Sequence, residues 1–231
     1  MYGSTRRIIA VALASATLVA SCGSNGHGNG QGNGQGDEGV THVGGSLLDG
    51  QLATIGTSVL TAADRTNLAY MREEERLAHD VYVALGERWG LRTFENIARA
   101  EATHTTAVKT LLDRYGITDP VGTNAPGVFT DQELQALYTS LTAQGSASLT
   151  EALRVGALIE ELDIADLQAR RSAAADVQLV FDNLERGSRN HLRAFNRQLT
   201  SNGLTYRPTH ISQADFDSIV NSPTERGGSA G

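Results

Sequence analysis

The sequence has a single cysteine among its 231 residues, so an intrachain disulfide is excluded and the folded part must be stable without one. Aromatic residues make up only 5% of the chain, and no basic stripe accompanies them. With a formal net charge of −7, this composition argues against nucleic-acid binding, which uses basic patches and aromatic stacking platforms. No segment alternates polar and apolar residues with an enrichment in β-branched side chains, so no sheet is expected. The sequence therefore predicts an all-α protein whose helices pack mainly through Leu, Ala and Val.

The N-terminal segment, residues 1–21, has the pattern of a secretory signal peptide. Arg6 and Arg7 precede a short apolar run, residues 8–19, and small residues follow it. Cys22 stands directly after these small residues, as in the lipobox of bacterial lipoproteins, which predicts that Cys22 carries a lipid. The alternative is an ordinary signal peptide with an incidental cysteine. We therefore expect an exported protein of the cell envelope, extracytoplasmic and held at the membrane by a lipid anchor.

The rest of the chain divides into a tether, a helical domain and a tail. Residues 22–60 start with a stretch of almost only Gly, Asn, Gln and Ser, which predicts a flexible tether and lead-in. Residues 61–220 have helical periodicity almost throughout, and residues 221–231 predict a disordered tail. Four long helices are expected to begin at Thr61, Thr93, Ser148 and near Ala174, with short helices beginning at Thr130 and spanning Ser212–Val220.

The most informative feature is that acidic residues and histidines fall on the apolar faces of all four long helices. A charged side chain turned inward is costly unless it is paired or binds a metal. Glu101 and His104 are three residues apart, so they share one face of the second helix and can reach the same ion. The sequence predicts that the metal ligands are Glu74, Glu101, His104, Glu160, Asp163 and His191, with Glu75 as the alternative to Glu74.

This pattern is typical of di-iron and di-manganese bundles, which take a Glu from each of two helices and a Glu-x-x-His from each of the other two. The fourth helix departs from the pattern, because Ser188 rather than Glu stands three residues before His191. Asp163, one turn beyond Glu160, is expected to replace the missing carboxylate. With fewer dedicated carboxylates, a mononuclear or asymmetric centre is an open alternative.

A second interpretation of the same residues is a buried ion-pair network without metal. Arg72, Arg76 and Arg99 are close in sequence to the acids, although their helical positions fall off the apolar stripes. In that case the acids and histidines would neutralise one another together with these arginines.

Three segments, Met71–Tyr82, Val155–Asp166 and Arg186–Phe195, resemble an uncharacterised bacterial and archaeal family of ferritin-like domains, many of whose members are exported. The resemblance extends from Asp64 to Val220. It implies a ferritin-like four-helix bundle with a long crossover between the second and third long helices. Residues 117–148, with their extra short helix, fit that crossover. No reaction is assigned to the family.

The function predicted from the sequence is that of an exported ferritin-like protein with one or two iron or manganese ions. Oxidation of ferrous iron, reduction of peroxide and oxidation of a small substrate are the candidate activities, and the sequence assigns no catalytic residue. Two alternatives are a metal-binding protein without turnover and a structural envelope protein with an ion-pair core. The expected partners are the metal and, through the lipid anchor, the membrane, while a homodimer is left open.

Overall fold

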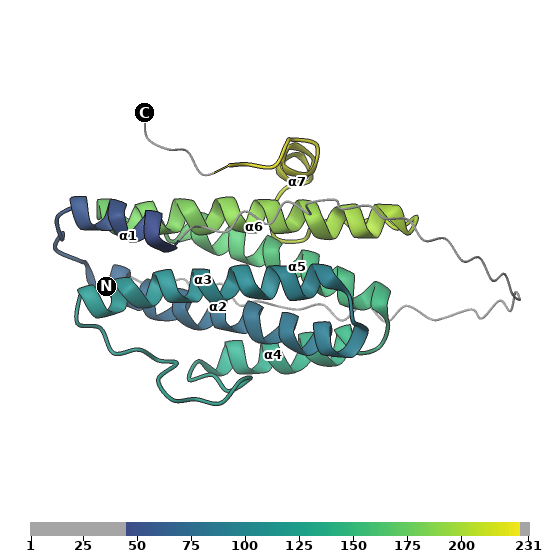
Figure 1. Cartoon of the computed structure of the whole chain (residues 1–231), viewed down its shortest axis with the longest axis horizontal. Coiled ribbons are helices and arrows are strands. Elements are labelled where there is room, and N and C mark those ends of the chain that lie inside the picture. Colours follow the sequence, from purple (N-terminus) through teal and green to yellow (C-terminus); the bar gives the residue numbers. More distant parts are fainter. Residues whose placement is uncertain (1–44, 227–231) are drawn as a thin grey trace, which may run out of the picture. The chain divides into compact units, whose positions relative to one another are not determined.

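The computed structural model describes residues 45–226. The predicted signal peptide, the lipidation site at Cys22 and the glycine-rich part of the tether lie outside the described residues. Within residues 45–226 the chain forms seven helices and no strand, which confirms the all-α prediction (Figure 1). None of these helices is both long and apolar enough to cross a membrane.

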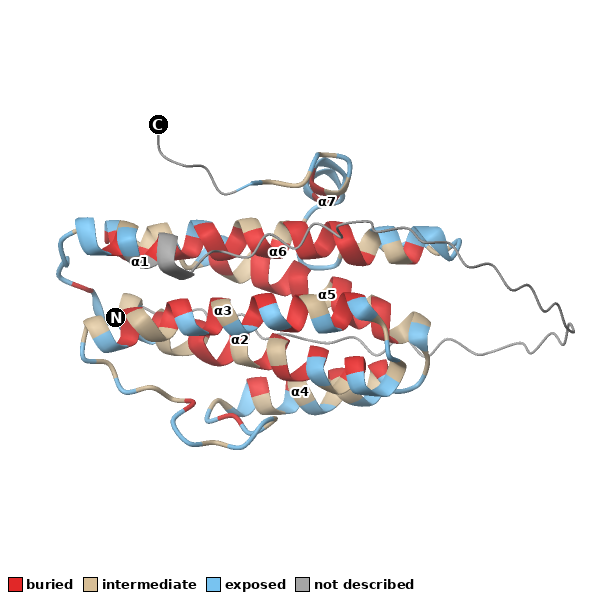
Figure 2. Ribbon diagram, viewed as in Figure 1, coloured by how far each residue is buried: buried red, intermediate tan, exposed pale blue. Residues whose placement is uncertain are grey.

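Four long helices enclose the core. They are α2 (Ala62–Trp89), α3 (Arg92–Arg114), α5 (Leu149–Ala169) and α6 (Ala175–Ser201). Helix α2 packs on α3 and α5 packs on α6, and further contacts join α3 to α6 and α2 to α5. Buried residues line the inner sides of these helices (Figure 2). Within each pair, a short turn joins the two helices. The connection from α3 to α5 is long and contains α4 (Gln132–Gly145), which lies against α2 and α5.

Local sequence explains most of the helix ends. Thr61 accepts a hydrogen bond from the backbone N–H of Asp64, whose carboxylate accepts one from the backbone N–H of Thr61, so α2 begins at a capping box. It ends at Gly90, which has a left-handed φ of 62°. The expected start of α4 at Thr130 is wrong by one residue, because Asp131 caps α4 and the Thr130 backbone N–H donates to Glu73 instead.

The core has three layers along the helices. One end is an apolar cluster that includes Met71, Val108 and Leu184. The other end is an aromatic group, in which the rings of Tyr82 and Phe195 have centroids 5.4 Å apart and Phe94 packs against both. Since α2 and α3 run in opposite directions, the residues at mid-length on each helix meet between these two apolar layers. That middle layer contains the predicted polar cluster.

Helix α1 (Gly45–Thr54) lies in the segment expected to be a flexible lead-in. Its side chains Leu48 and Leu52 are buried and join the apolar cluster. Arg114 of α3 donates a hydrogen bond of 2.8 Å to the carbonyl oxygen of Leu52. The described part of the predicted lead-in thus contains a helix whose apolar residues extend the core.

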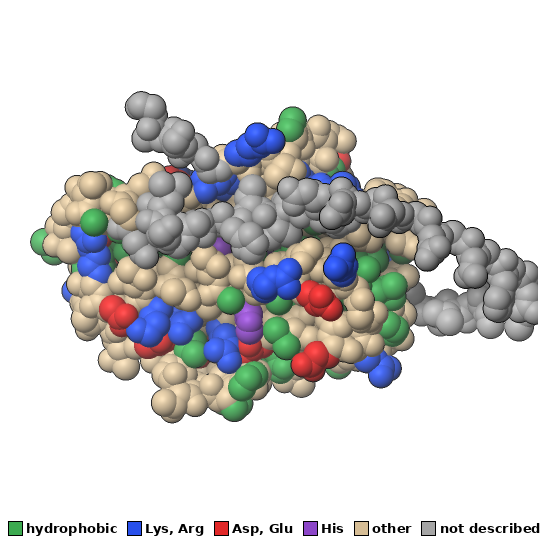
Figure 3. All heavy atoms as spheres, in the orientation of Figure 1, with side chains coloured by type: hydrophobic (Ala, Val, Ile, Leu, Met, Phe, Trp, Pro, Cys, Tyr) green, Lys and Arg blue, Asp and Glu red, His purple; other side chains and the backbone are tan. Residues whose placement is uncertain are grey.

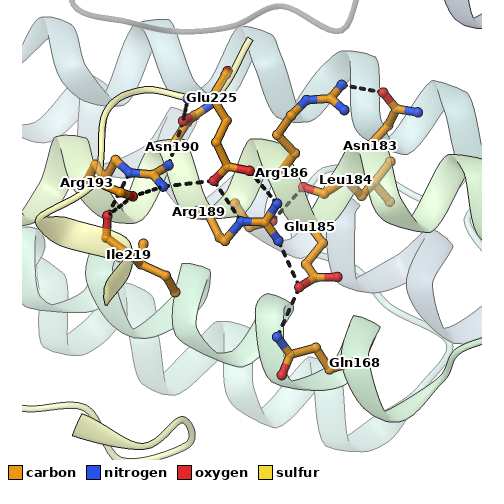
Figure 4. Close-up of polar contacts among 12 residues, drawn as sticks. Gln168, Asn183, Leu184, Glu185, Arg186, Arg189, Asn190, Arg193, Ile219 and Glu225 are labelled. Atoms are coloured by element: carbon orange, nitrogen blue, oxygen red, sulfur yellow. Dashed lines mark hydrogen bonds and ion pairs between the residues drawn. The ribbon is translucent and has the colours of Figure 1, made fainter. Parts of the chain in front are cut away.

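The C-terminal segment is also more ordered than expected up to residue 226. Helix α7 (Gln213–Val220) corresponds to the predicted short final helix, and it packs on α6. Beyond it, Glu225 accepts hydrogen bonds from Arg189 and Arg193 of α6 at 2.6–2.8 Å (Figure 4). Arg193 also donates to the carbonyl oxygen of Ile219 at 2.8 Å. The segment predicted to be a disordered tail thus begins with residues that are hydrogen-bonded to α6.

On the face shown in Figure 3, acidic, basic and apolar side chains are interspersed.

Candidate metal centre

Five side chains from the four long helices meet in the middle layer. Their donor atoms form two groups, each with atoms within 4.8 Å of one another: Glu75, Glu101 and His104 in the first, and Glu101, Glu160 and His191 in the second. Every one of these residues is at most 1% exposed. The structure therefore brings together Glu101, His104, Glu160 and His191 of the predicted ligands with Glu75, the alternative to Glu74.

Glu101 belongs to both groups and divides its carboxylate between them. One oxygen, Oε2, lies 2.8 Å from Nδ1 of His104, and the other, Oε1, lies 2.8 Å from Nδ1 of His191. Glu75 Oε2 lies 3.3 Å from the same His104 nitrogen, and Glu160 Oε2 lies 3.4 Å from that of His191. The two imidazole rings have centroids 5.5 Å apart at an interplanar angle of 26°. This is a nearly symmetric arrangement about Glu101.

Many polar atoms of the cluster are buried without a hydrogen-bond partner among the described residues. They are both carboxylate oxygens of Glu75, Oε1 of Glu101, Oε2 of Glu160, Nε2 of His104 and both ring nitrogens of His191. Glu101 Oε1 and His191 Nδ1 are close, yet their contact lies outside the directional range of a hydrogen bond. An unsatisfied buried polar group costs about 1–3 kcal/mol, and more for a charged group. Atoms that converge without bonding one another suit a bound cation.

Two other buried glutamates provide an internal comparison. Glu73 accepts hydrogen bonds from the backbone N–H groups of Thr130 and Asp131. Glu161 accepts from the hydroxyl of Tyr206 and from three successive backbone N–H groups, including that of Ile211. The fold can thus satisfy a buried carboxylate with protein donors, which makes the unsatisfied oxygens of the cluster distinctive.

Burial and mutual charge set the protonation of the cluster in the metal-free state. Burial raises the pKa of Glu75 to about 8, although His104 opposes this. Burial acts to lower the pKa of His191, but the carboxylates of Glu160 and Glu101 outweigh it and raise the pKa to about 9. Burial would raise the pKa of Glu101, yet the two imidazoles lower it. Without metal the imidazoles therefore hold protons, which a binding ion displaces.

Asp163 lies beside the two groups rather than in either of them. Ser188 Oγ donates a hydrogen bond of 2.5 Å to Asp163 Oδ2, while Asp163 Oδ1 has no partner among the described residues. Burial and then the charges of Glu75, Glu101 and Glu160 raise the pKa of Asp163 well above its ordinary value. Ser188 thus takes the place where a second Glu-x-x-His would have its carboxylate, and it orients Asp163 from the facing helix.

Glu74, the residue that the sequence pattern favours on the first helix, points to a different neighbourhood. It shares a hydrogen bond with Asp166 of α5 and lies near Tyr70 and Arg170. Glu75 takes the position toward His104 instead. The helical spacing fits both residues: Glu75 is four residues after Met71 and seven before Tyr82, and Glu74 is three after Met71 and seven before Val81, all of which are fully buried. The spacing therefore does not decide between them, and the packing of α2 does.

The arginines of the ion-pair interpretation are engaged elsewhere. Arg72 pairs with Asp119 at 3.1 Å, Arg76 with Asp80 at 2.7 Å, and Arg99 donates to Asn96. These partners all lie outside the five-residue cluster. The geometry therefore does not support a network in which these arginines neutralise the buried acids.

Two further residues shape the site. Tyr82 donates a hydrogen bond of 2.5 Å to Glu160 Oε1, which fixes one oxygen of that carboxylate. Gly187 of α6 faces the His104 ring so closely that a Cβ there would lie 2.5 Å from His104 Cε1 and 2.6 Å from Nε2. The absence of a side chain at Gly187 is therefore required by the position of His104.

Replacing Gly187 with alanine is expected to weaken metal binding, because the added methyl displaces the His104 ring. We expect an affinity loss of about 10- to 100-fold, the range found when groups that orient a ligand are altered. Competition titration with Mn²⁺ measures it. Gly86→Ala is the matched control, since its Cβ would meet Phe94 at an ordinary 3.5 Å and the helix gains about 1 kcal/mol of propensity. Equal affinities in the two variants would contradict the assigned role of Gly187.

The fold and the site define an all-α domain with a buried carboxylate–imidazole cluster that could hold metal ions. The chain belongs to the DUF2202 family, described as an uncharacterized protein domain, whose model matches residues 64–223 and so includes the whole cluster. A relative, the uncharacterized protein MJ0754 of Methanocaldococcus jannaschii, is 43% identical over 178 residues, which cover 76% of this chain and 96% of that protein. The crystal structure of hypothetical protein MJ0754 matches with a TM-score of 0.73 and 43% identity, covering 74% of this chain and 99% of the matched chain.

Proposed function

We propose that this domain is a ferritin-like four-helix bundle that binds two iron or manganese ions, with Glu101 as the shared ligand. The observation that carries the proposal is that Glu101 belongs to both donor groups and directs one oxygen toward each imidazole. Glu75 and His104 would complete one side, and Glu160 and His191 the other. Carboxylate and imidazole ligands suit both metals, and the bundle core is where such proteins place them.

The charge of the cluster supports two divalent ions. Four carboxyl groups, those of Glu75, Glu101, Glu160 and Asp163, face only two imidazoles. With all acids ionised and both imidazoles neutral, the excess is four negative charges, which two divalent cations balance. With one ion, two of these acids would have to stay protonated, because an unpaired charge is strongly disfavoured in an apolar layer. The second Glu-x-x-His carboxylate is missing, and Asp163, oriented by Ser188, supplies the balancing charge.

A redox activity is the catalytic extension of this proposal. Bound iron or manganese would supply one-electron chemistry toward oxygen or peroxide. The residues of the chain would hold and orient the ions: Glu101 joins the two sides, and Tyr82 fixes Glu160 through its hydrogen bond. The apolar and aromatic layers on either side of the cluster keep bulk water away. Complete burial of the five residues also favours a second candidate function, metal binding without turnover.

The test is to purify the full chain without chelators, measure its metals, and then add ferrous iron under air. We expect bound iron or manganese and consumption of oxygen by the iron-loaded protein. Glu101→Ala, which removes the residue common to both donor groups, should abolish both, whereas Glu151→Gln, which changes a surface acid paired with Arg154, should abolish neither. Metal binding without oxygen or peroxide consumption would select the non-catalytic function. Failure of the intact protein to retain any iron or manganese would contradict the proposal as a whole.

A further inference from the structure

A row of acids continues from the metal cluster toward the end of α5. Glu160, Asp163 and Asp166 follow one another at three-residue spacing, so they share one face of this helix. Glu74 of α2 lies beside the last two: it shares a hydrogen bond with Asp166, and after burial the charges of Asp166 and Asp163 raise its pKa. The row therefore links the buried cluster to Asp166 and Glu74, two acids that are not ligands in the proposed centre.

The outer end of the row reaches solvent. The side chain of Asp166 is 22% exposed, in contrast to the fully enclosed cluster. It accepts a hydrogen bond from the hydroxyl of Tyr70 at 3.3 Å and lies 3.3 Å from a guanidinium nitrogen of Arg170. That guanidinium stacks over the Tyr70 ring, 3.9 Å from its centroid, and donates to Asn67. A cationic side chain thus covers the acid at the surface.

The inner members of the row keep oxygen atoms without partners. Glu74 is 5% exposed and Asp163 is 3% exposed. Oε2 of Glu74 and Oδ1 of Asp163 are both buried without a hydrogen-bond partner among the described residues, although each carboxyl group is held through its other contacts. Buried carboxylates with a structural role, such as Glu161, have both oxygens satisfied, in this case by backbone N–H groups and by the hydroxyl of Tyr206. The free oxygens of Glu74 and Asp163 are therefore suited to a cation that is present only transiently.

We propose that Asp166, Glu74 and Asp163 form the entry route along which a divalent cation passes from the surface to the cluster, with Arg170 covering its mouth. This inference rests on the proposed function, since the cluster is the destination of the ion. Each acid offers one oxygen to the ion as its hydration shell is removed. The next acid lies deeper along the row, so the ion is not left unpaired in the apolar interior. When no ion is entering, Arg170 pairs with the outermost carboxylate, that of Asp166.

The experiment is a stopped-flow measurement of Co²⁺ uptake by the metal-free full chain, followed through the visible absorption of bound Co²⁺. Glu74→Gln replaces one carboxyl group of the route with an amide and leaves the five cluster residues unchanged, so uptake should be slower by about tenfold or more. The final amount of bound Co²⁺ should equal that of the unmodified protein. Arg170→Gln should make uptake faster, because it removes the positive charge at the mouth. Asp166→Asn, at the outer, partly exposed end of the row, provides a second slowing variant if Glu74→Gln does not fold.

The matched control is Asp182→Asn, which makes the same acid-to-amide replacement at a side chain that is 51% exposed and paired with Arg171. It should take up Co²⁺ at the unmodified rate. The route would be overturned if Glu74→Gln or Asp166→Asn took up Co²⁺ as fast as this control. It would also be overturned if Arg170→Gln were not faster than the unmodified protein. Either result would leave the metal centre in place. Failure of the unmodified protein to bind Co²⁺ would overturn the centre and the route together.

Discussion

Replacing Glu101 with alanine is expected to remove both metal ions, whereas replacing either Glu75 or Glu160 is expected to remove only one. Glu101 is the residue common to the two donor groups, and each of its oxygens faces a different imidazole. Its loss leaves one carboxylate and one imidazole on each side, too few to hold an ion firmly in a buried site. Elemental analysis of the purified variants gives the number of ions per chain.

The comparison among the variants is the informative part of this experiment. Glu75→Ala should keep the ion between Glu101, Glu160 and His191, and Glu160→Ala should keep the other. Glu151→Gln, on the exposed side of α5, should keep both. A Glu101→Ala protein that retains as much metal as Glu75→Ala would show that Glu101 is not shared. The site would then be mononuclear or asymmetric.

Metal removal is expected to lower the melting temperature by about 10 °C. An ion that binds only the folded state at about 1,000 times its Kd stabilises that state by about 4 kcal/mol. For a chain of about 150–250 residues, each kcal/mol shifts the melting temperature by about 2–4 °C. Removal also leaves the carboxyl groups of the middle layer without the cation that compensates their charge. Calorimetry of the full chain with Mn²⁺ and after chelation measures the difference.

The control for this measurement is the Glu101→Ala variant, in which added Mn²⁺ should leave the melting temperature unchanged. A metal-independent melting temperature in the unmodified protein would instead favour the interpretation of the cluster as a structural ion-pair network. The two outcomes therefore distinguish a core that is stabilised by bound metal from a core that is stable without metal.

Most of the helix positions could be predicted because their signals are local. The capping box at Thr61 and the serine cap at Ser148 place the starts of α2 and α5, and Gly90 places the end of α2. Helices that depend on tertiary contacts could not be predicted from local sequence patterns. Helix α1 is stabilised by burial of Leu48 and Leu52 against other helices, and no local feature of a glycine-rich stretch indicates this.

The candidate site was predictable to the extent that it follows helix periodicity. Glu101, His104, Glu160 and His191 each sit on the inward face of a long helix, and the structure brings them together. The choice between Glu74 and Glu75 depended on the rotation of α2 by part of a turn, which packing decides. The burial of Glu73 and Glu161 also depends on tertiary contacts. Their partners are backbone N–H groups of segments distant in the sequence, such as that of Thr130.

The most direct test of the central claim is anomalous diffraction from crystals of the manganese-loaded protein, recorded on both sides of the manganese absorption edge. Two peaks are predicted per chain. One should lie between Glu75, Glu101 and His104, and the other between Glu101, Glu160 and His191, with Glu101 contacting both. A single peak, or density with no anomalous signal among these five residues, would contradict a two-ion centre that shares Glu101.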